Sequence, residues 1–305
     1  MDEAFNNKLF EITELRCKYS GDKTVLHVQD LIIEKGKITA ILGLSGIGKS
    51  TILETLGLMN RTMPKESNVL FYPSGNSVPI NYSSLWYDSD EKERAKIRRE
   101  HFSFIFQESN LMQSFTARDN LYIALMLQNK DKKEYVGQVE NYIDEMRLRQ
   151  ELSTNPKIFQ LSGGERQRLS FIRAIAPDFT VLFGDEPTGN LDRVNAAGAL
   201  KILSTNIKSK GKSAVIVTHD IDLSVEYADN LILINRRSEK LNGHNHYYGY
   251  VDSSNTYQSS VSAMGKLWRN HSTSEWHDNA WMLEEIISVF KEAGAVDILK
   301  DSRLD

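Results

Sequence analysis

The sequence predicts an α/β fold in which helices cover a largely parallel β-sheet. Short apolar runs recur along the chain, and several of them end in polar side chains. The run Lys37–Leu42 leads into a glycine-rich turn, and the turn leads into Thr51–Met59, whose apolar residues have helical spacing. Strand, turn and helix in this order form the unit from which parallel sheets are built. Two strand-like runs, Leu9–Tyr19 and Thr24–Glu34, precede this unit and predict a smaller antiparallel sheet beside the main one.

The turn between the first strand and helix of the core fits the phosphate-binding pattern G-x-x-x-x-G-K-[ST] over Gly43–Ser50. Its glycines let successive backbone N–H groups point at phosphate oxygens, and the helix that follows adds the positive end of its dipole. Lys49 places a point charge near the β- and γ-phosphates, and Ser50 offers a hydroxyl to Mg²⁺. The flanking strand and helix argue against an ordinary glycine-rich surface turn. We expect a nucleoside triphosphate to be bound by Gly43, Ser45, Gly46, Gly48, Lys49, Ser50 and Thr51.

Helical periodicity marks the middle of the chain. The runs Ala117–Gln128 and Lys132–Leu148 predict two helices between Thr116 and Ala176, and the α/β core resumes near Phe179.

Polar side chains follow three further strand-like runs of the core. Phe102–Phe106 precedes Gln107, Val181–Gly184 precedes Asp185 and Glu186, and Ala214–Thr218 precedes His219. Ligands bind at the carboxyl ends of the strands in open α/β sheets, so we expect these side chains to converge near the phosphate-binding loop.

The chemistry of triphosphate hydrolysis requires groups of this kind. Asp185 is the expected acidic partner of Mg²⁺, with Ser50 and Gln107 as its other ligands. The adjacent Glu186 can orient or deprotonate water, and Gln107 can bridge the metal and that water. His219 can donate to the γ-phosphate. Taken alone, Asp185 and Glu186 would be an ordinary polar strand end, but their order after a phosphate-binding loop favours the catalytic interpretation.

A second potential anion site occurs at Leu161–Glu165. Ser162, Gly163 and Gly164 directly precede a predicted helix at Arg166–Ala176, so a hydroxyl and backbone N–H groups are available there. Because the chain already has one phosphate cradle, a second one suggests use between two molecules. The alternative is an ordinary serine N-cap followed by flexible glycines.

Taken together, these motifs resemble those of the ATP-binding subunit of ATP-binding-cassette (ABC) systems, over roughly residues 7–235. Gly43–Ser50 matches the Walker A motif, Gln107 the Q-loop, and Leu161–Glu165 the ABC signature. The remaining matches are Asp185 and Glu186 at the end of Walker B, Gly189–Asp192 as the D-loop, His219 as the switch histidine, and Tyr19 as the aromatic residue that stacks on adenine.

The resemblance implies a P-loop NTPase core with an antiparallel β-subdomain and a helical signature subdomain at about 108–176, within a domain spanning 1–235. It implies an ATPase that uses ATP and Mg²⁺ and acts as a homodimer or with a paired ATPase subunit. Ser162, Gly163 and Gly164 would contact ATP held by the partner copy. Residues 108–116 fall where such subunits meet a separate integral-membrane permease, which would hold the chain at the inner face of the membrane.

Finer features point to one group within this family. Phe106–Leu111, Glu165–Arg168 and Asp185–Asp192 resemble the group that serves lipoprotein release, macrolide efflux and cell division, although Gly184 stands where that group usually has alanine. Export or extrusion is therefore the expected role, with a mechanotransmitting regulator that moves no solute as the alternative. A soluble ABC protein of translation or DNA repair is disfavoured, because those usually carry two cassettes or a long coiled coil.

Composition limits the other function classes. The 305 residues are enough for one large domain with an appendage or for two domains, and the net charge of −4 gives no electrostatic case for a nucleic-acid partner. No apolar run approaches the roughly 18–20 residues needed to span a bilayer. Met1–Asn7 lacks the apolar core of a signal peptide, and the single Cys17 excludes an internal disulfide. We expect a soluble, cytoplasmic protein whose membrane role depends on a partner chain.

The segment 236–305 extends beyond the resemblance. Gly243–Val251 and the Ser- and Asn-rich Asp252–Ala263 predict turn and loop, or alternatively a strand pair. Trp276–Ala293 has the apolar spacing of an amphipathic helix, which either packs on its own core or binds a partner. No metal site is expected from the histidines of this segment, which lack tight i,i+4 spacing and cysteine neighbours. These histidines are His244, His246, His271 and His277.

Overall fold

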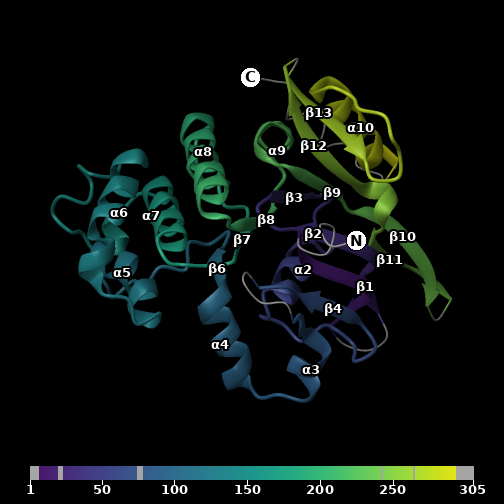
Figure 1. The fold of residues 1–305 in the computed structure, drawn as a ribbon, viewed down its shortest axis with the longest axis horizontal. Helices are drawn as coiled ribbons and strands as arrows, with labels where there is room; N and C mark the ends of the chain where they lie inside the picture. Colours follow the sequence, from purple (N-terminus) through teal and green to yellow (C-terminus); the bar gives the residue numbers. More distant parts are fainter. Residues whose placement is uncertain (1–6, 20–22, 74–77, 242, 264, 293–305) are drawn as a thin grey trace.

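The computed structural model describes residues 7–19, 23–73, 78–241, 243–263 and 265–292, and it contains two β-sheets with helices packed around them (Figure 1). Most of the N-terminal stretch considered for a signal peptide, and Ala293 at the end of the last predicted helix, lie outside the described residues.

The first sheet is largely antiparallel and has the strand order β10–β11–β2–β1–β4–β5. Its strands are β1 (Lys8–Lys18), β2 (Thr24–Glu34), β4 (Asn68–Phe71), β5 (Ile80–Asn81), β10 (Asn235–Leu241) and β11 (His244–Val251). Strands β1 and β2 pair along nearly their whole length, which confirms the predicted antiparallel pair to within one residue. Strand β11 is the exception in direction, because it runs parallel to β2.

The second sheet forms the core and has the strand order β13–β12–β9–β3–β8–β7–β6. Its strands are β3 (Ile38–Leu42), β6 (Phe102–Ile105), β7 (Val181–Asp185), β8 (Ser213–Val217), β9 (Asn230–Leu233), β12 (Thr256–Ser262) and β13 (Gly265–Asn270). The pairs from β9 through β6 are parallel, whereas β12 and β13 add to the edge in antiparallel fashion. Both faces of the parallel part are covered, so its strands are nearly continuous apolar runs. The predicted α/β fold is therefore confirmed.

The helices are α2 (Lys49–Leu56), α3 (Tyr82–Tyr87), α4 (Glu91–His101), α5 (Ala117–Leu127), α6 (Lys132–Glu145), α7 (Gly163–Ile175), α8 (Arg193–Lys210), α9 (Ile221–Tyr227) and α10 (Asn279–Glu292), with short 3₁₀ turns at Ile158–Gln160 and Ser253–Asn255. Helices α5, α6 and α7 stand together to one side of the sheets (Figure 1). The first two confirm the predicted helical runs, although α6 ends three residues before Leu148. Helix α7 begins three residues before the predicted Arg166, because Ser162 caps it.

The core consists of two apolar clusters, one on each face of the second sheet. One fills the space between the two sheets around α2, where aromatic rings stack and meet edge to face: Phe10 and Phe71 have centroids 5.0 Å apart, and Phe102 and Phe183 5.2 Å. The other covers the opposite face and reaches α5–α8 and α10. The sheet is thereby fixed on both sides, which holds the ends of its strands in register.

The C-terminal segment corrects one prediction. Residues 243–263 are not mainly turn and loop, because β11 and β12 account for most of them. The alternative is right that both segments contain strands, but these strands do not pair with each other: β11 pairs with β10 on the first sheet, and β12 pairs with β13 on the second. Helix α10 confirms the predicted amphipathic helix and packs on α9 and β13 through buried Met282, Ile286 and Phe290, so it covers its own core.

Three further observations concern membrane-spanning helices, metal ligands and the C-terminal histidines. Within the described ranges, no helix has both the length and the apolar character to cross a membrane. In the same part of the chain, no three His, Cys, Asp or Glu side chains are grouped as metal ligands. Of the C-terminal histidines, His246 donates through Nε2 to the Thr24 carbonyl oxygen at 2.6 Å.

Candidate functional site

A cavity of about 660 Å³ lies beside the phosphate-binding loop, at the carboxyl ends of the core strands. This volume is in the range typical of small-molecule sites. The cavity is lined by Tyr19, Val25, Gly43, Ser45, Gly46, Gly48, Lys49, Ser50, Thr51, Gln107, Asp185, Glu186, His219 and Phe290. The structure thus brings together every residue that the sequence predicted for the chain's own nucleotide site.

The loop leaves the fully buried strand β3 and curls before entering α2. Gly46 and Gly48 have φ values of 73° and 103°, a left-handed backbone that favours glycine. Gly48 is also the N-cap of α2, whose first residues, with N–H groups that have no partner inside the helix, line the cavity. The local backbone therefore has the form that an anion site at a helix N-terminus requires.

Lys49 is folded back onto the loop that carries it. Its Nζ donates to the carbonyl oxygens of Gly43 at 2.8 Å and Leu44 at 3.0 Å. Burial lowers the pKa of the Lys49 ammonium, while the nearby charges of Glu186 and Asp185 act in the opposite direction. The charged group is therefore held beside the cavity by neutral acceptors, which an anionic ligand could replace.

Glu186 and His219 form a pair at the far side of the cavity. Oε1 of Glu186 lies 2.9 Å from Nδ1 of His219, and the histidine side chain is 74% exposed whereas the carboxylate side chain is only 13% exposed. The backbone of Glu186 is left-handed, with φ of 48°, and its N–H donates to the Val217 carbonyl at 2.8 Å. A strained backbone at a non-glycine residue is held only where the surroundings enforce it, and such residues gather at functional sites.

Tyr19 lines the cavity and is 59% exposed. Its hydroxyl lies 3.2 Å from Oγ1 of Thr51, the residue after the loop serine. An exposed ring held over the start of α2 is available for stacking on a planar base.

Two residues of the cavity wall were not predicted. Val25 lies on β2, and Phe290 comes from α10, far along the chain. No motif marks either residue. The amphipathic spacing of α10 predicted that Phe290 would be buried, but not which surface it would meet.

The signature residues lie elsewhere, because Ser162, Gly163 and Gly164 are not among the residues that line the cavity. Ser162 caps α7: its Oγ accepts from the Glu165 N–H at 3.3 Å, and the Glu165 carboxylate accepts from the Ser162 N–H at 2.8 Å. A Cβ added at Gly164 would lie 3.5 Å from the carbonyl oxygen of Asn190, so the signature abuts the predicted D-loop. Within a single chain, Ser162 acts as an N-cap.

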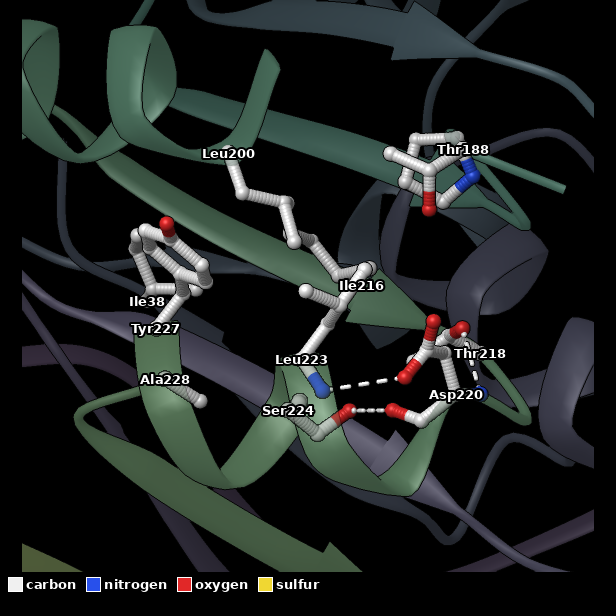
Figure 2. A pocket seen from close by; sticks show the side chains of 12 residues that line it. Ile38, Thr188, Leu200, Ile216, Thr218, Asp220, Leu223, Ser224, Tyr227 and Ala228 are labelled. Carbon is white, nitrogen blue, oxygen red and sulfur yellow. Dashed lines mark hydrogen bonds between the residues drawn. The ribbon is translucent and has the colours of Figure 1, made fainter. Parts of the chain in front are cut away.

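A second cavity, of about 20 Å³, lies between the core sheet and helices α8 and α9 (Figure 2). It is lined mostly by apolar groups and has room for about one water molecule, so it is too small for a nucleotide. The segment beside it is tightly bonded: the Asp220 side chain accepts from the Leu223 N–H at 2.9 Å, and Ser224 Oγ donates to the Asp220 carbonyl at 2.6 Å (Figure 2). These bonds anchor the residue that follows His219.

Comparison with known proteins agrees with this geometry. The family model described as ABC transporter matches residues 26–189. The lipoprotein-releasing system ATP-binding protein LolD of Colwellia psychrerythraea is 35% identical over 221 residues, which cover 72% of this chain and 80% of LolD. The macrolide export ATP-binding/permease protein MacB of Rhodopseudomonas palustris is 34% identical over 232 residues, which cover 73% of this chain and 33% of MacB.

Solved structures of ATP-binding cassettes are also similar to this chain. The ATP-binding cassette MJ0796, in a dimeric post-hydrolysis state bound to ADP and Pi, matches with a TM-score of 0.61 and 27% identity over 73% of this chain and 93% of the cassette. The fold alone is also shared with cbiO1 of Clostridium perfringens, at a TM-score of 0.63 and 22% identity over 92% of this chain.

The fold and the cavity define a P-loop nucleotide-binding protein of the cassette type. The chain belongs to the ABC transporter family. It is an ATP-binding subunit of that family and an ATPase, as its sequence motifs predicted.

Proposed function

We propose that two copies of this chain, or one copy and a paired ATPase subunit, close around ATP and thereby move a separate transmembrane partner. The observation that carries the proposal is the separation of the two phosphate-binding segments. The Gly43–Ser50 loop lines the chain's own cavity, whereas Ser162, Gly163 and Gly164 form the start of α7 and do not line it. A second molecule supplies the missing half, and the dimeric MJ0796 cassette supports this arrangement.

Within each site, the donor set fits Mg²⁺. The Ser50 hydroxyl, the Gln107 amide oxygen and the Asp185 carboxylate are the oxygen ligands that this hard cation prefers, and all three residues line the cavity. When bound, Mg²⁺ neutralises charge that develops on the phosphate oxygens. Ser50, Gln107 and Asp185 would hold it.

Lys49, Glu186 and His219 have separate roles in ATP binding and hydrolysis. Lys49 exchanges its two carbonyl acceptors for phosphate oxygens. Glu186, released from His219, accepts a proton from the attacking water, and His219 donates to the γ-phosphate. The Glu186 backbone, fixed by its bond to Val217, keeps the carboxylate in place during this exchange.

The surface next to the Q-loop residue Gln107 supports a membrane partner. Met112, Phe115 and Phe159 are 44%, 39% and 72% exposed. The two segments that carry them are joined, because Nζ of Lys157 donates to the Ser114 carbonyl oxygen at 2.8 Å. Exposed apolar side chains on two segments joined in this way favour docking of another protein. We therefore place the chain at the inner face of the membrane, bound to a permease subunit, and the names of its LolD and MacB relatives favour export or extrusion.

The proposal is tested with Glu186→Gln, which keeps the shape of the side chain and removes its basicity. We expect kcat to fall about 100-fold or more, the usual contribution of a general base. We also expect ATP to produce a stable dimer in size-exclusion chromatography. Glu145→Gln, on the exposed face of α6, is the matched control and should turn over normally. Normal turnover of Glu186→Gln, or no dimer with ATP, would contradict the proposal.

A further inference from the structure

Strand β11 of the C-terminal segment passes directly behind the phosphate-binding loop. A Cβ added at Gly249 would lie 2.1 Å from the carbonyl oxygen of Ile47, in the middle of that loop. It would also lie 2.8 Å from Cγ2 of Ile234 and 3.0 Å from Cδ1 of Leu26. The backbone of Gly249 is not left-handed, so the position requires glycine for space and not for conformation.

The contact determines the direction of one peptide group of the loop. The trans peptide between Ile47 and Gly48 is planar, so its carbonyl oxygen and its N–H point in opposite directions. The Ile47 oxygen faces Gly249, and the Gly48 N–H therefore points away from β11. Gly48 is one of the residues that line the nucleotide cavity.

Strand β11 has little freedom to move away from the loop. Gly249 pairs with Leu26 of β2, and Val251 pairs with Val28. Val251 is fully buried in the same apolar cluster as Ile47, and the Tyr250 hydroxyl donates to the Gln29 side chain. Because β11 is fixed at these points, a side chain at position 249 would displace the loop.

We propose that Gly249 is a positioning residue of the nucleotide site: its lack of a side chain lets β11 support the Ile47 carbonyl and so aims the Gly48 amide at the phosphates. This inference rests on ATP binding at the Gly43–Ser50 loop in the proposed function. It depends neither on dimer closure nor on the membrane partner.

The direct test is Gly249→Ala in the full chain, with ATP affinity measured by calorimetry at a temperature well below unfolding. We expect at least tenfold weaker ATP binding and a KM at least tenfold higher. We expect kcat at saturating ATP to fall less than threefold, since Glu186 and His219 follow the ends of other strands, β7 and β8. A structural role alone would lower thermal stability without this split between KM and kcat.

Two control variants separate positioning from stability. Gly137→Ala, on α6, places its Cβ where no atom lies within 4 Å, and should bind ATP like the wild type. Ile143→Ala, at a buried position of α6 in the other apolar cluster, should lower the unfolding temperature and leave ATP affinity unchanged. ATP affinity of Gly249→Ala within twofold of the wild type would overturn the inference.

Should Gly249→Ala fail to fold, hydrogen exchange of the wild-type chain gives the answer. ATP should slow exchange of the amides of Tyr248–Val251 on β11, because loop and strand share one packing surface, and should leave those of β13 unchanged. Equal exchange in β11 with and without ATP would overturn the inference. A wild-type chain that bound no ATP would overturn the proposed function as well, whereas normal ATP affinity in Gly249→Ala overturns this inference alone.

Discussion

Replacing Ser162 with alanine separates the two roles that this residue has in the sequence and the structure. In one chain, its Oγ accepts from the Glu165 N–H and caps α7. In the proposed dimer, the same hydroxyl donates to a phosphate oxygen bound by the partner copy. The two roles are compatible, because a hydroxyl has one donor and two acceptor sites. The variant Ser162→Ala removes both at once, and their magnitudes differ.

The two losses can be calculated separately. Removal of an N-cap typically costs about 1 kcal/mol of folding stability, which lowers Tm by roughly 2–4 °C in a chain of this size. A hydrogen bond to a charged group contributes about 1.5–3 kcal/mol, and a dimer with two sites loses two of them, about 3–6 kcal/mol in all. Since about 1.4 kcal/mol is tenfold, the dimer should dissociate about 10²–10⁴-fold more readily.

The assay compares ATP-dependent dimerisation in the Glu186→Gln background, by size-exclusion chromatography or analytical ultracentrifugation, with Tm and monomer ATP affinity. Thr116→Ala is the matched control, because Thr116 and Asp119 form the same kind of capping box at the start of α5. Both variants should lose similar stability, but only Ser162→Ala should lose the dimer. Ser162→Asn should keep the cap, since asparagine caps as well as serine, and still block the dimer by its size.

Two outcomes would refute the reasoning. Normal dimerisation of Ser162→Ala would leave Ser162 with its capping role alone. A large loss of ATP affinity in the monomeric variant would instead assign Ser162 to its own chain's site, against the separation seen between α7 and the cavity.

Three further outcomes are expected. Tyr19→Ser should weaken ATP binding about tenfold through loss of stacking, whereas the ATP affinity of Tyr19→Phe should stay within twofold of the wild type. Titration of both variants with ATP distinguishes the role of the ring from that of its hydroxyl. Phe159→Ser should leave the ATPase activity and Tm of the isolated chain unchanged but abolish co-purification with the membrane partner, and co-purification at wild-type yield would exclude this surface. Lys266 is the third case: its ammonium donates to the Val225 and Glu226 carbonyl oxygens at the end of α9. Burial of this ammonium lowers the pKa of Lys266 to about 8. Above that pH the unfolded chain holds more protons, so the free energy of unfolding should rise from pH 8 toward 10, and urea titrations of Lys266→Met should show no such rise.

The nucleotide site could be predicted from sequence because its signals are local. The phosphate-binding loop is one continuous stretch, and Gln107, Asp185 and His219 each lie at or just after the end of a strand whose apolar run is visible in the sequence. Parallel strands in one sheet place their carboxyl ends at the same edge, so the convergence follows from topology alone. The structure adds that Glu186 has a left-handed backbone, a feature that no composition pattern reveals.

The C-terminal segment shows the limit of such reasoning. Strand β10, Asn235–Leu241, contains Arg236, Arg237, Ser238, Glu239 and Lys240, so it has no apolar run to mark it as a strand. It is a strand because it pairs with β11, which in turn pairs with β2 some 220 residues earlier. The need for glycine at position 249 also cannot be read from the sequence, because it arises from close contact with the loop at Ile47, which is far away in the chain.

The polar groups proposed to act on ATP already have partners within the chain. Lys49 donates to loop carbonyls, His219 pairs with Glu186, and the Ser162 hydroxyl accepts from an N–H of α7. Phosphate oxygens can replace or complement each of these partners, so binding exchanges hydrogen bonds instead of only breaking them. The exchange at His219 has a direct chemical consequence. When His219 donates to a phosphate oxygen, the Glu186 carboxylate loses its partner and becomes free to accept a proton from water. Under the proposed function, ATP binding itself would release the base that hydrolyses it.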